Sequence, residues 1–160
     1  MGSSDLDAVL LPKVDSADMV RQAEAVIDAA GAPEGMAIWC MMETPRGMLR
    51  AEEIADAISR LGGFVMGTSD LTKDLHARHT AMRLPMITSL GICLLAARAA
   101  GIAILDGVYL DLSDADACMD SCVQGAELGF DGKTLIHPKQ LAPANEAFAP
   151  PLPSPIPKAI

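Results

Sequence analysis

Aromatic residues make up only 3% of this 160-residue chain, although 51% of its residues are hydrophobic. A core with so few rings has to be built from Ala, Leu, Ile, Val and Met, and the ten methionines suit that role. The length is sufficient for one domain with a sizeable core, and it is short for two. We therefore expect a single domain with an aliphatic core.

Basic residues are also few, because 12 Lys and Arg stand against 21 Asp and Glu and give a formal charge of −9. Nucleic acids and anionic membrane surfaces require a basic footprint, so neither is expected as a partner. The most apolar run, residues 90–104, contains Arg98 and is interrupted by Gly101, which makes it unsuited to span a bilayer. These features predict a cytoplasmic protein whose partner is a small molecule.

The four cysteines show no paired Cys-x-x-Cys spacing, which favours free, buried thiols in a reducing compartment. Cys118 and Cys122 are four residues apart on an expected helix and could share a metal, but no His or second Cys pair stands nearby. The sequence also has no GxGxxG, GxxxxGK[ST], GxSxG or HExxH motif. These absences argue against nucleotide-dependent and nucleophilic-serine chemistry.

Short apolar runs alternate with amphipathic segments along the chain. The runs expected as buried strands are residues 8–11, 37–42, 64–66, 102–105 and 134–136. The segments expected as helices are residues 16–30, 45–61, 88–100 and 113–128, and residues 72–83 are expected as a polar loop or lid. Strands that are apolar throughout are typical of a parallel α/β sheet covered by helices. The pattern fits a doubly wound sheet or part of a (β/α)8 barrel, since a whole barrel needs about 250 residues.

Polar side chains follow each expected strand, namely Lys13, Glu43, Asp70, the 106–111 segment and His137. The carboxyl ends of parallel strands lie at one edge, where α/β folds place their sites. Glu43 and Asp70 are the predicted metal ligands, because Mg²⁺ takes one or two carboxylates and completes its shell with water and substrate. The alternative is that both carboxylates cap the helices that follow them.

The remaining candidates each have two interpretations. Lys13 could pair with a substrate carboxylate or be a solvated loop lysine, and Gly67 could admit a ligand close to the backbone or serve as an ordinary turn glycine. His137 could transfer a proton or be a hydrogen-bonded structural residue. His76 and His79 have ligand-like spacing, although they stand in a polar stretch where solvation is the alternative.

Five motifs stand in the order of a known family. They are Leu11-Pro12-Lys13-Val14, Met42-Glu43-Thr44-Pro45, Gly67-Thr68-Ser69-Asp70-Leu71, Asp106-Gly107-Val108-Tyr109 and Gly132-Lys133-Thr134-Leu135-Ile136-His137-Pro138. Together they resemble the citrate lyase β-subunit-like branch of the HpcH/HpaI aldolase superfamily, which includes malyl-CoA and citramalyl-CoA lyases. The resemblance extends over about residues 6–150.

The resemblance implies a (β/α)8 barrel in which Glu43 and Asp70 hold Mg²⁺, with Lys13, Gly67 and Thr68 as substrate contacts. Members of the family cleave or form a carbon–carbon bond next to a CoA thioester, or in a related 2-oxo acid, through a metal-stabilised enolate. Some members hydrolyse the thioester instead. We therefore expect a Mg²⁺-dependent lyase for a hydroxy-acyl-CoA of the malyl, citramalyl or citryl type.

The resemblance also divides the chain. Residues 1–149 correspond to strands four to eight of the barrel, and residues 150–160 are expected as a Pro-rich, disordered tail. The family's active-site arginine and lid acid have no counterpart, so no catalytic residue is assigned and the catalytic set is expected to be incomplete. A thioesterase on the same scaffold, or a non-catalytic or degenerate domain that binds a partner subunit, are the alternatives. Open sheet edges predict a homo-oligomer or assembly with a separate N-terminal half.

Overall fold

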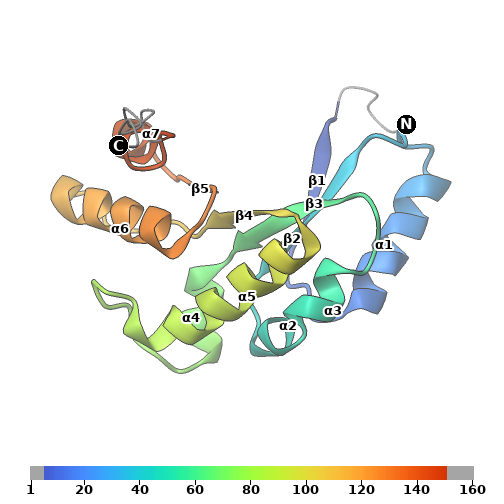
Figure 1. The fold of residues 1–160 in the computed structure, drawn as a ribbon, viewed down its shortest axis with the longest axis horizontal. Coiled ribbons are helices and arrows are strands. Elements are labelled where there is room, and N and C mark those ends of the chain that lie inside the picture. Colours follow the sequence, from blue (N-terminus) through green and yellow to red (C-terminus); the bar gives the residue numbers. More distant parts are fainter. Residues whose placement is uncertain (1–5, 151–160) are drawn as a thin grey trace, which may run out of the picture.

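A computed structural model describes residues 6–150 and contains one sheet of five parallel strands (Figure 1). The strands are β1 (Ala8–Leu11), β2 (Ala37–Met42), β3 (Leu61–Met66), β4 (Ala103–Asp106) and β5 (Gly132–Lys133). Their order in the sheet is their order in the chain. That order is typical of a segment of a (β/α)8 barrel, whereas a doubly wound sheet reverses its strand order at a switch point. The predicted α/β class with about five parallel β-α units is confirmed.

Helices lie between these strands along the chain, and a last helix follows the final strand. They are α1 (Ala17–Ala29), α2 (Pro45–Leu49), α3 (Ala51–Ala55), α4 (Thr68–Asp74), α5 (Ile87–Ala100), α6 (Ala115–Leu128) and α7 (Leu141–Ala147). Two 3₁₀ turns, Leu84–Met86 and Pro138–Gln140, precede α5 and α7. Ser16 and Asp114 cap α1 and α6 through their side-chain oxygens, and glycines in the left-handed region end α5 and α6. A capping side chain at the start of a helix and a glycine at its end are common start and stop signals of helices.

The core lies between one face of the sheet and the helices. Along β2 the burial alternates: Ile38, Cys40 and Met42 are fully buried on the helix side, and the residues between them are half-buried. Phe64 is the largest fully buried side chain, and its neighbours in the core are mostly Leu, Ile, Met and Ala. The structure therefore has the aliphatic core that the composition predicts, and all four cysteines are free and buried.

The expected helix over residues 45–61 is wrong at its end, because α2 and α3 stop at Ala55 and Leu61 begins β3. Gly62 and Gly63, expected after the helix, lie inside the strand. A Cβ at Gly62 would come within 2.6 Å of the Trp39 indole nitrogen, and one at Gly63 within 2.5 Å of the Ala103 carbonyl oxygen. The glycines therefore make room in the sheet for Trp39 and for close pairing with β4.

Other expected boundaries also move. Helix α4 takes up residues 72–74 of the expected loop, because Leu71 and Thr72 are buried and the Thr72 hydroxyl donates to the Thr68 carbonyl at 2.7 Å. The last strand is β5 at residues 132–133 instead of 134–136, and α7 was not expected. Of the predicted Pro-rich tail, residues 151–160 lie outside the described residues, as do residues 1–5.

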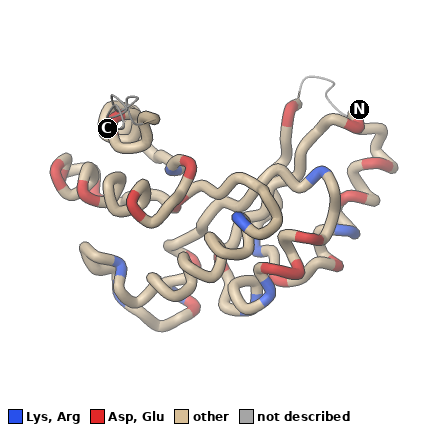
Figure 2. The backbone as a smooth tube through the Cα atoms, in the orientation of Figure 1, with Lys and Arg blue, Asp and Glu red and all other residues tan. Residues whose placement is uncertain are grey.

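The acidic excess is distributed over several helices. Figure 2 marks positions of Asp and Glu in red along α1, α3 and α6. Among residues 6–150, no helix combines the length and the hydropathy needed to cross a membrane.

Candidate functional site

Glu43 and Asp70 lie at the carboxyl ends of neighbouring strands. Glu43 directly follows β2 and is only 6% exposed, and Asp70 stands in the first turn of α4, which follows β3. The register of the two strands pairs Met42 with Met66, so Glu43 comes beside Gly67. Asp70 therefore lies in the first turn of a helix, at the same edge of the sheet as Glu43.

Gly67 makes room for the Glu43 side chain. Its backbone N–H donates to the Met42 carbonyl at 2.9 Å, which continues the pairing of β2 with β3. A Cβ at this position would lie 2.4 Å from the Glu43 Cβ and 2.6 Å from Glu43 Oε2. Only glycine allows the two to approach this closely, so Gly67 determines where the Glu43 carboxylate lies.

Lys13 contacts both carboxylates. Its backbone N–H donates to Glu43 Oε1 at 2.8 Å, and its ammonium group forms an ion pair with Asp70. The backbone of Lys13 has a φ of +50°, a left-handed conformation that is uncommon for a residue with a long side chain. Such strain is found at sites where the surrounding structure holds a residue in one position.

The charges at this edge influence one another. The hydrogen bond to Asp70 is the largest cause that raises the pKa of Lys13, and the charges of Asp70, Glu43 and Asp74 add to it. The same hydrogen bond, followed by the charge of Lys13, lowers the pKa of Asp70. Asp70 is therefore held as a carboxylate and Lys13 as an ammonium ion at neutral pH.

The donor set suits magnesium. Two carboxylates at one edge are what Mg²⁺ takes from a protein, with water and substrate oxygens filling its other positions. Within residues 6–150, no group of three or more His, Cys, Asp and Glu side chains is placed to hold a metal. A closed zinc site or a calcium cage would need such a group. The Asp70 carboxylate is already paired with one positive charge, the ammonium group of Lys13.

A second cluster of charges lies at the ends of β4 and β5. Asp106 is fully buried and accepts two hydrogen bonds from Arg83 Nη1, at 2.6 and 2.8 Å, and one from Lys133 Nζ at 2.9 Å. The register of β4 and β5 places Asp106 and Lys133 side by side. The sequence placed Asp106 in the polar segment that follows an expected strand, and it did not point to Arg83 or Lys133 as its partners.

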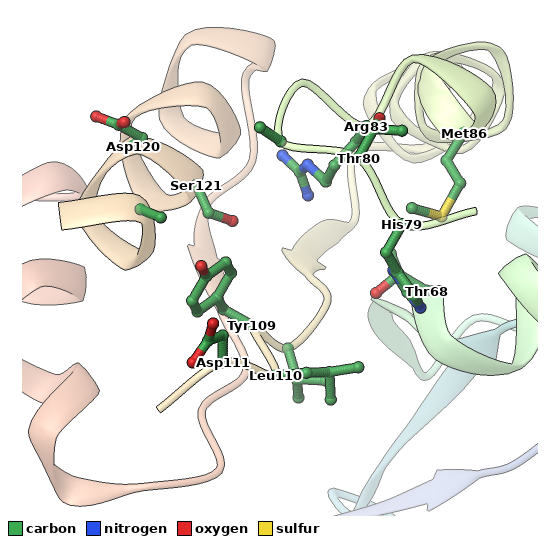
Figure 3. A pocket seen from close by; sticks show the side chains of 13 residues that line it. Thr68, His79, Thr80, Arg83, Met86, Tyr109, Leu110, Asp111, Asp120 and Ser121 are labelled. Carbon is green, nitrogen blue, oxygen red and sulfur yellow. The ribbon is translucent and has the colours of Figure 1, made fainter. Parts of the chain in front are cut away.

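A cavity of about 370 Å³ adjoins the second cluster through Arg83. One wall carries Thr68 and Arg83, and the opposite wall carries Tyr109 and Ser121 (Figure 3). Thr68 directly follows Gly67, so the cavity begins next to the residue that accommodates Glu43. A cavity of this size can hold a small molecule beside Arg83.

The model of the HpcH/HpaI aldolase/citrate lyase family matches residues 2–138. The chain belongs to this family. It is 52% identical over 147 residues to a (3S)-malyl-CoA thioesterase of Cereibacter sphaeroides, and this match covers 92% of the chain and 49% of the relative. It is 34% identical to the citrate lyase subunit beta of Leuconostoc mesenteroides, over 94% of the chain and 51% of that protein. The chain thus spans about half the length of the curated relatives it matches.

Solved structures of the family have the same fold. The citrate lyase beta subunit of Mycobacterium tuberculosis, complexed with oxaloacetate and magnesium, superposes with a TM-score of 0.75 at 30% identity. That match covers 90% of this chain and 62% of the other. RipC from Yersinia pestis gives a TM-score of 0.81 at 26% identity over 90% of this chain and 64% of RipC. The predicted family and the barrel-type fold are confirmed.

In this HpcH/HpaI family member, the histidines and Thr68 that the sequence singled out lie outside the group formed by Lys13, Glu43 and Asp70. His137 caps the 3₁₀ turn before α7, because its Nδ1 accepts a hydrogen bond from the Lys139 N–H at 3.1 Å. This contact agrees with the interpretation of His137 as a hydrogen-bonded structural residue. His76 and His79 are exposed in the segment after α4, and His79 lines the cavity. Thr68 is 4% exposed and also lines the cavity. The roles of Lys13, Gly67 and Thr68 as substrate contacts stay predictions.

Proposed function

We propose that this HpcH/HpaI family member acts on CoA thioesters of hydroxy acids, with Mg²⁺ held by Glu43 and Asp70. The observation that carries the proposal is the convergence of both carboxylates on Lys13 at one edge of the sheet. Magnesium in the solved structures of family members supports the choice of ion. A relative solved with magnesium, acetoacetate and coenzyme A supports the class of substrate.

Thioester hydrolysis is the reaction we favour. Relatives that are 52% and 53% identical are named (3S)-malyl-CoA thioesterases. In that reaction water adds to the thioester carbonyl of malyl-CoA, the carbon–sulfur bond breaks, and malate and free CoA leave. The carbon–carbon lyase expected from the sequence is the second candidate, supported by relatives at 34% identity that are named citrate lyase subunit beta. It would split malyl-CoA into glyoxylate and acetyl-CoA.

Bound Mg²⁺ would supply a Lewis acid that polarises substrate oxygens and orients them. The residues of the chain would position and charge the groups that hold the ion and the substrate. The Lys13 N–H and the absence of a Cβ at Gly67 hold the buried Glu43 carboxylate in one position. Asp70, with its lowered pKa, stays ionised as a ligand. Lys13 keeps its proton and is the group that would pair with a carboxylate of the acyl chain.

The identity of the products tests the proposal. Malyl-CoA is incubated with the protein and Mg²⁺, and malate, free CoA, glyoxylate and acetyl-CoA are measured. Malate with free CoA is the expected result, and glyoxylate with acetyl-CoA would establish the lyase instead. The Glu43→Gln and Asp70→Asn variants should lose the activity, whereas Asp18→Asn, at an 80% exposed side chain on α1, should keep it. If neither pair of products is formed, the proposal is overturned and a non-catalytic domain is favoured.

Self-association belongs to the same proposal. β1 and β5 lie at the two ends of the sheet, and Leu10 on β1 is 45% exposed. Natural proteins pair or cover the exposed edges of their sheets. A second copy of the chain, or further strands of a barrel, would cover the β1 edge. Solution mass at several concentrations should rise with concentration, and a monomer throughout would contradict the self-association.

A further inference from the structure

The cluster of Arg83, Asp106 and Lys133 carries more positive than negative charge. The side chains of Asp106 and Lys133 are 0% and 1% exposed, and that of Arg83 is 10% exposed. Two cations against one carboxylate leave a formal charge of +1 inside the protein. A buried charge without a counter-ion is unfavourable, and an additional anion would balance this one.

One nitrogen of the Arg83 guanidinium makes no hydrogen bond within the described residues. Nη1 donates to both carboxylate oxygens of Asp106, and Nε donates to Gln124 Oε1 at 2.7 Å. Nη2 is buried and has no hydrogen-bond partner within residues 6–150. A guanidinium presents its donors as a planar fork, which matches the oxygens of a carboxylate or a phosphate group.

Arg83 lines the cavity described above, and Figure 3 shows its guanidinium directed toward the space between the two walls. Apolar side chains of Met86, Val108 and Leu110 line much of the rest. Two carboxylates also belong to the lining. Asp111 accepts the N–H and the hydroxyl of Ser113, and Asp120 is exposed on α6. The cavity therefore has a cationic end at Arg83 and an acidic side at Asp111 and Asp120.

We propose that the Arg83 end of this cavity binds the oxyanion of a small ligand, a carboxylate or a phosphate group, whose apolar part lies along Met86, Val108 and Leu110. The anion would contact Nη2 and balance the charge of the buried cluster. Ser121, which lines the cavity and is 7% exposed, can donate its hydroxyl to the same group. The proposal does not rest on the proposed function, because it requires neither the metal pair nor turnover.

Calorimetric titration without Mg²⁺, at constant ionic strength, tests this site with inorganic phosphate in one arm and succinate in the other. Saturable binding of at least one anion is expected, and the arm that binds identifies the chemistry. Arg83→Lys keeps the charge beside Asp106 but removes Nη2, and it should weaken binding tenfold or more. Arg98→Lys is the matched control, because Arg98 pairs with Asp131, and it should bind like the wild type.

A second variant tests the cavity without changing Arg83, in case Arg83→Lys does not fold. Ala117 lines the cavity from α6 and does not belong to the charged cluster. Ala117→Phe should fill the space and block binding while the circular dichroism spectrum is retained. Failure of the wild type to bind either anion, or equal binding by Ala117→Phe, would overturn the proposal.

Discussion

Replacement of Gly67 by alanine is the sharpest perturbation of the proposed metal site. The new methyl group would lie 2.4 Å from the Glu43 Cβ, well inside the 3.5–4.0 Å or so at which carbon atoms pack. The backbone cannot simply retreat, because the Gly67 N–H is bonded to the Met42 carbonyl at 2.9 Å and the Gly67 carbonyl to the Leu71 N–H at 3.1 Å. Glu43 therefore has to move, and its hydrogen bond from the Lys13 N–H is broken.

The magnitude follows from this displacement. Overpacking in a well-packed site costs about 1–3 kcal/mol. We expect Gly67→Ala to lower the free energy of unfolding by about 2 kcal/mol, which corresponds to a fall in Tm of about 4–8 °C for a chain of this size. Because Glu43 is displaced, the affinity for Mg²⁺ should fall together with the stability.

Gly91→Ala is the matched control. A Cβ at Gly91, inside α5, would meet nothing within 4 Å. The same chemical change should therefore stabilise the protein by up to about 1 kcal/mol, because alanine favours the helix. Urea unfolding followed by circular dichroism, with calorimetric Mg²⁺ titration of each variant, measures both effects. A Gly67→Ala protein with the stability and Mg²⁺ affinity of the wild type would refute the reasoning.

Three further predictions concern other buried or paired groups. Asp106→Asn removes the carboxylate that faces two buried cations and should cost about 3–5 kcal/mol in urea unfolding, so a loss below about 1 kcal/mol would contradict the ion network. The pKa of Asp70 is lowered, so its pair with Lys13 contributes fully to the stability of the fold at pH values above the ordinary Asp pKa of 3.8. This contribution is lost as the pH falls through the pKa that Asp70 has in the folded protein. Carbon NMR titration should show the shift, and Lys13→Met should bring the pKa of Asp70 back up. Burial raises the thiol pKa of Cys40 and Cys93 to about 12, so both should resist thiol reagents at pH 8 until urea is added, and fast labelling of the folded protein would show them to be accessible.

The sequence predicts the strands that carry the site well. The expected strand over residues 37–42 coincides with β2, because six apolar residues in succession are followed at once by Glu43. The α/β class and the carboxylate edge follow from the same pattern. Gly62 and Gly63 were misplaced because their position depends on Trp39 of the neighbouring strand, a contact that no local signal in residues 62–63 reveals.

The second cluster was harder to predict for the same reason. Asp106 ends an apolar strand just as Glu43 does, and this signal could have identified it as a buried carboxylate. Its partners come from distant parts of the chain: Arg83 from the segment before α5, and Lys133 from β5. A lone arginine before an apolar helix looks solvated in the sequence, and only the fold shows that it is buried.

Calorimetric titration with Mg²⁺ of the wild type, Glu43→Gln, Asp70→Asn and the surface control Asp18→Asn tests the central claim most directly. The account predicts saturable binding by the wild type and the control, and binding that is at least tenfold weaker in both carboxylate variants. A folded wild type that binds no Mg²⁺, or carboxylate variants that bind it as well as the wild type, would contradict the assignment of Glu43 and Asp70 as the metal pair.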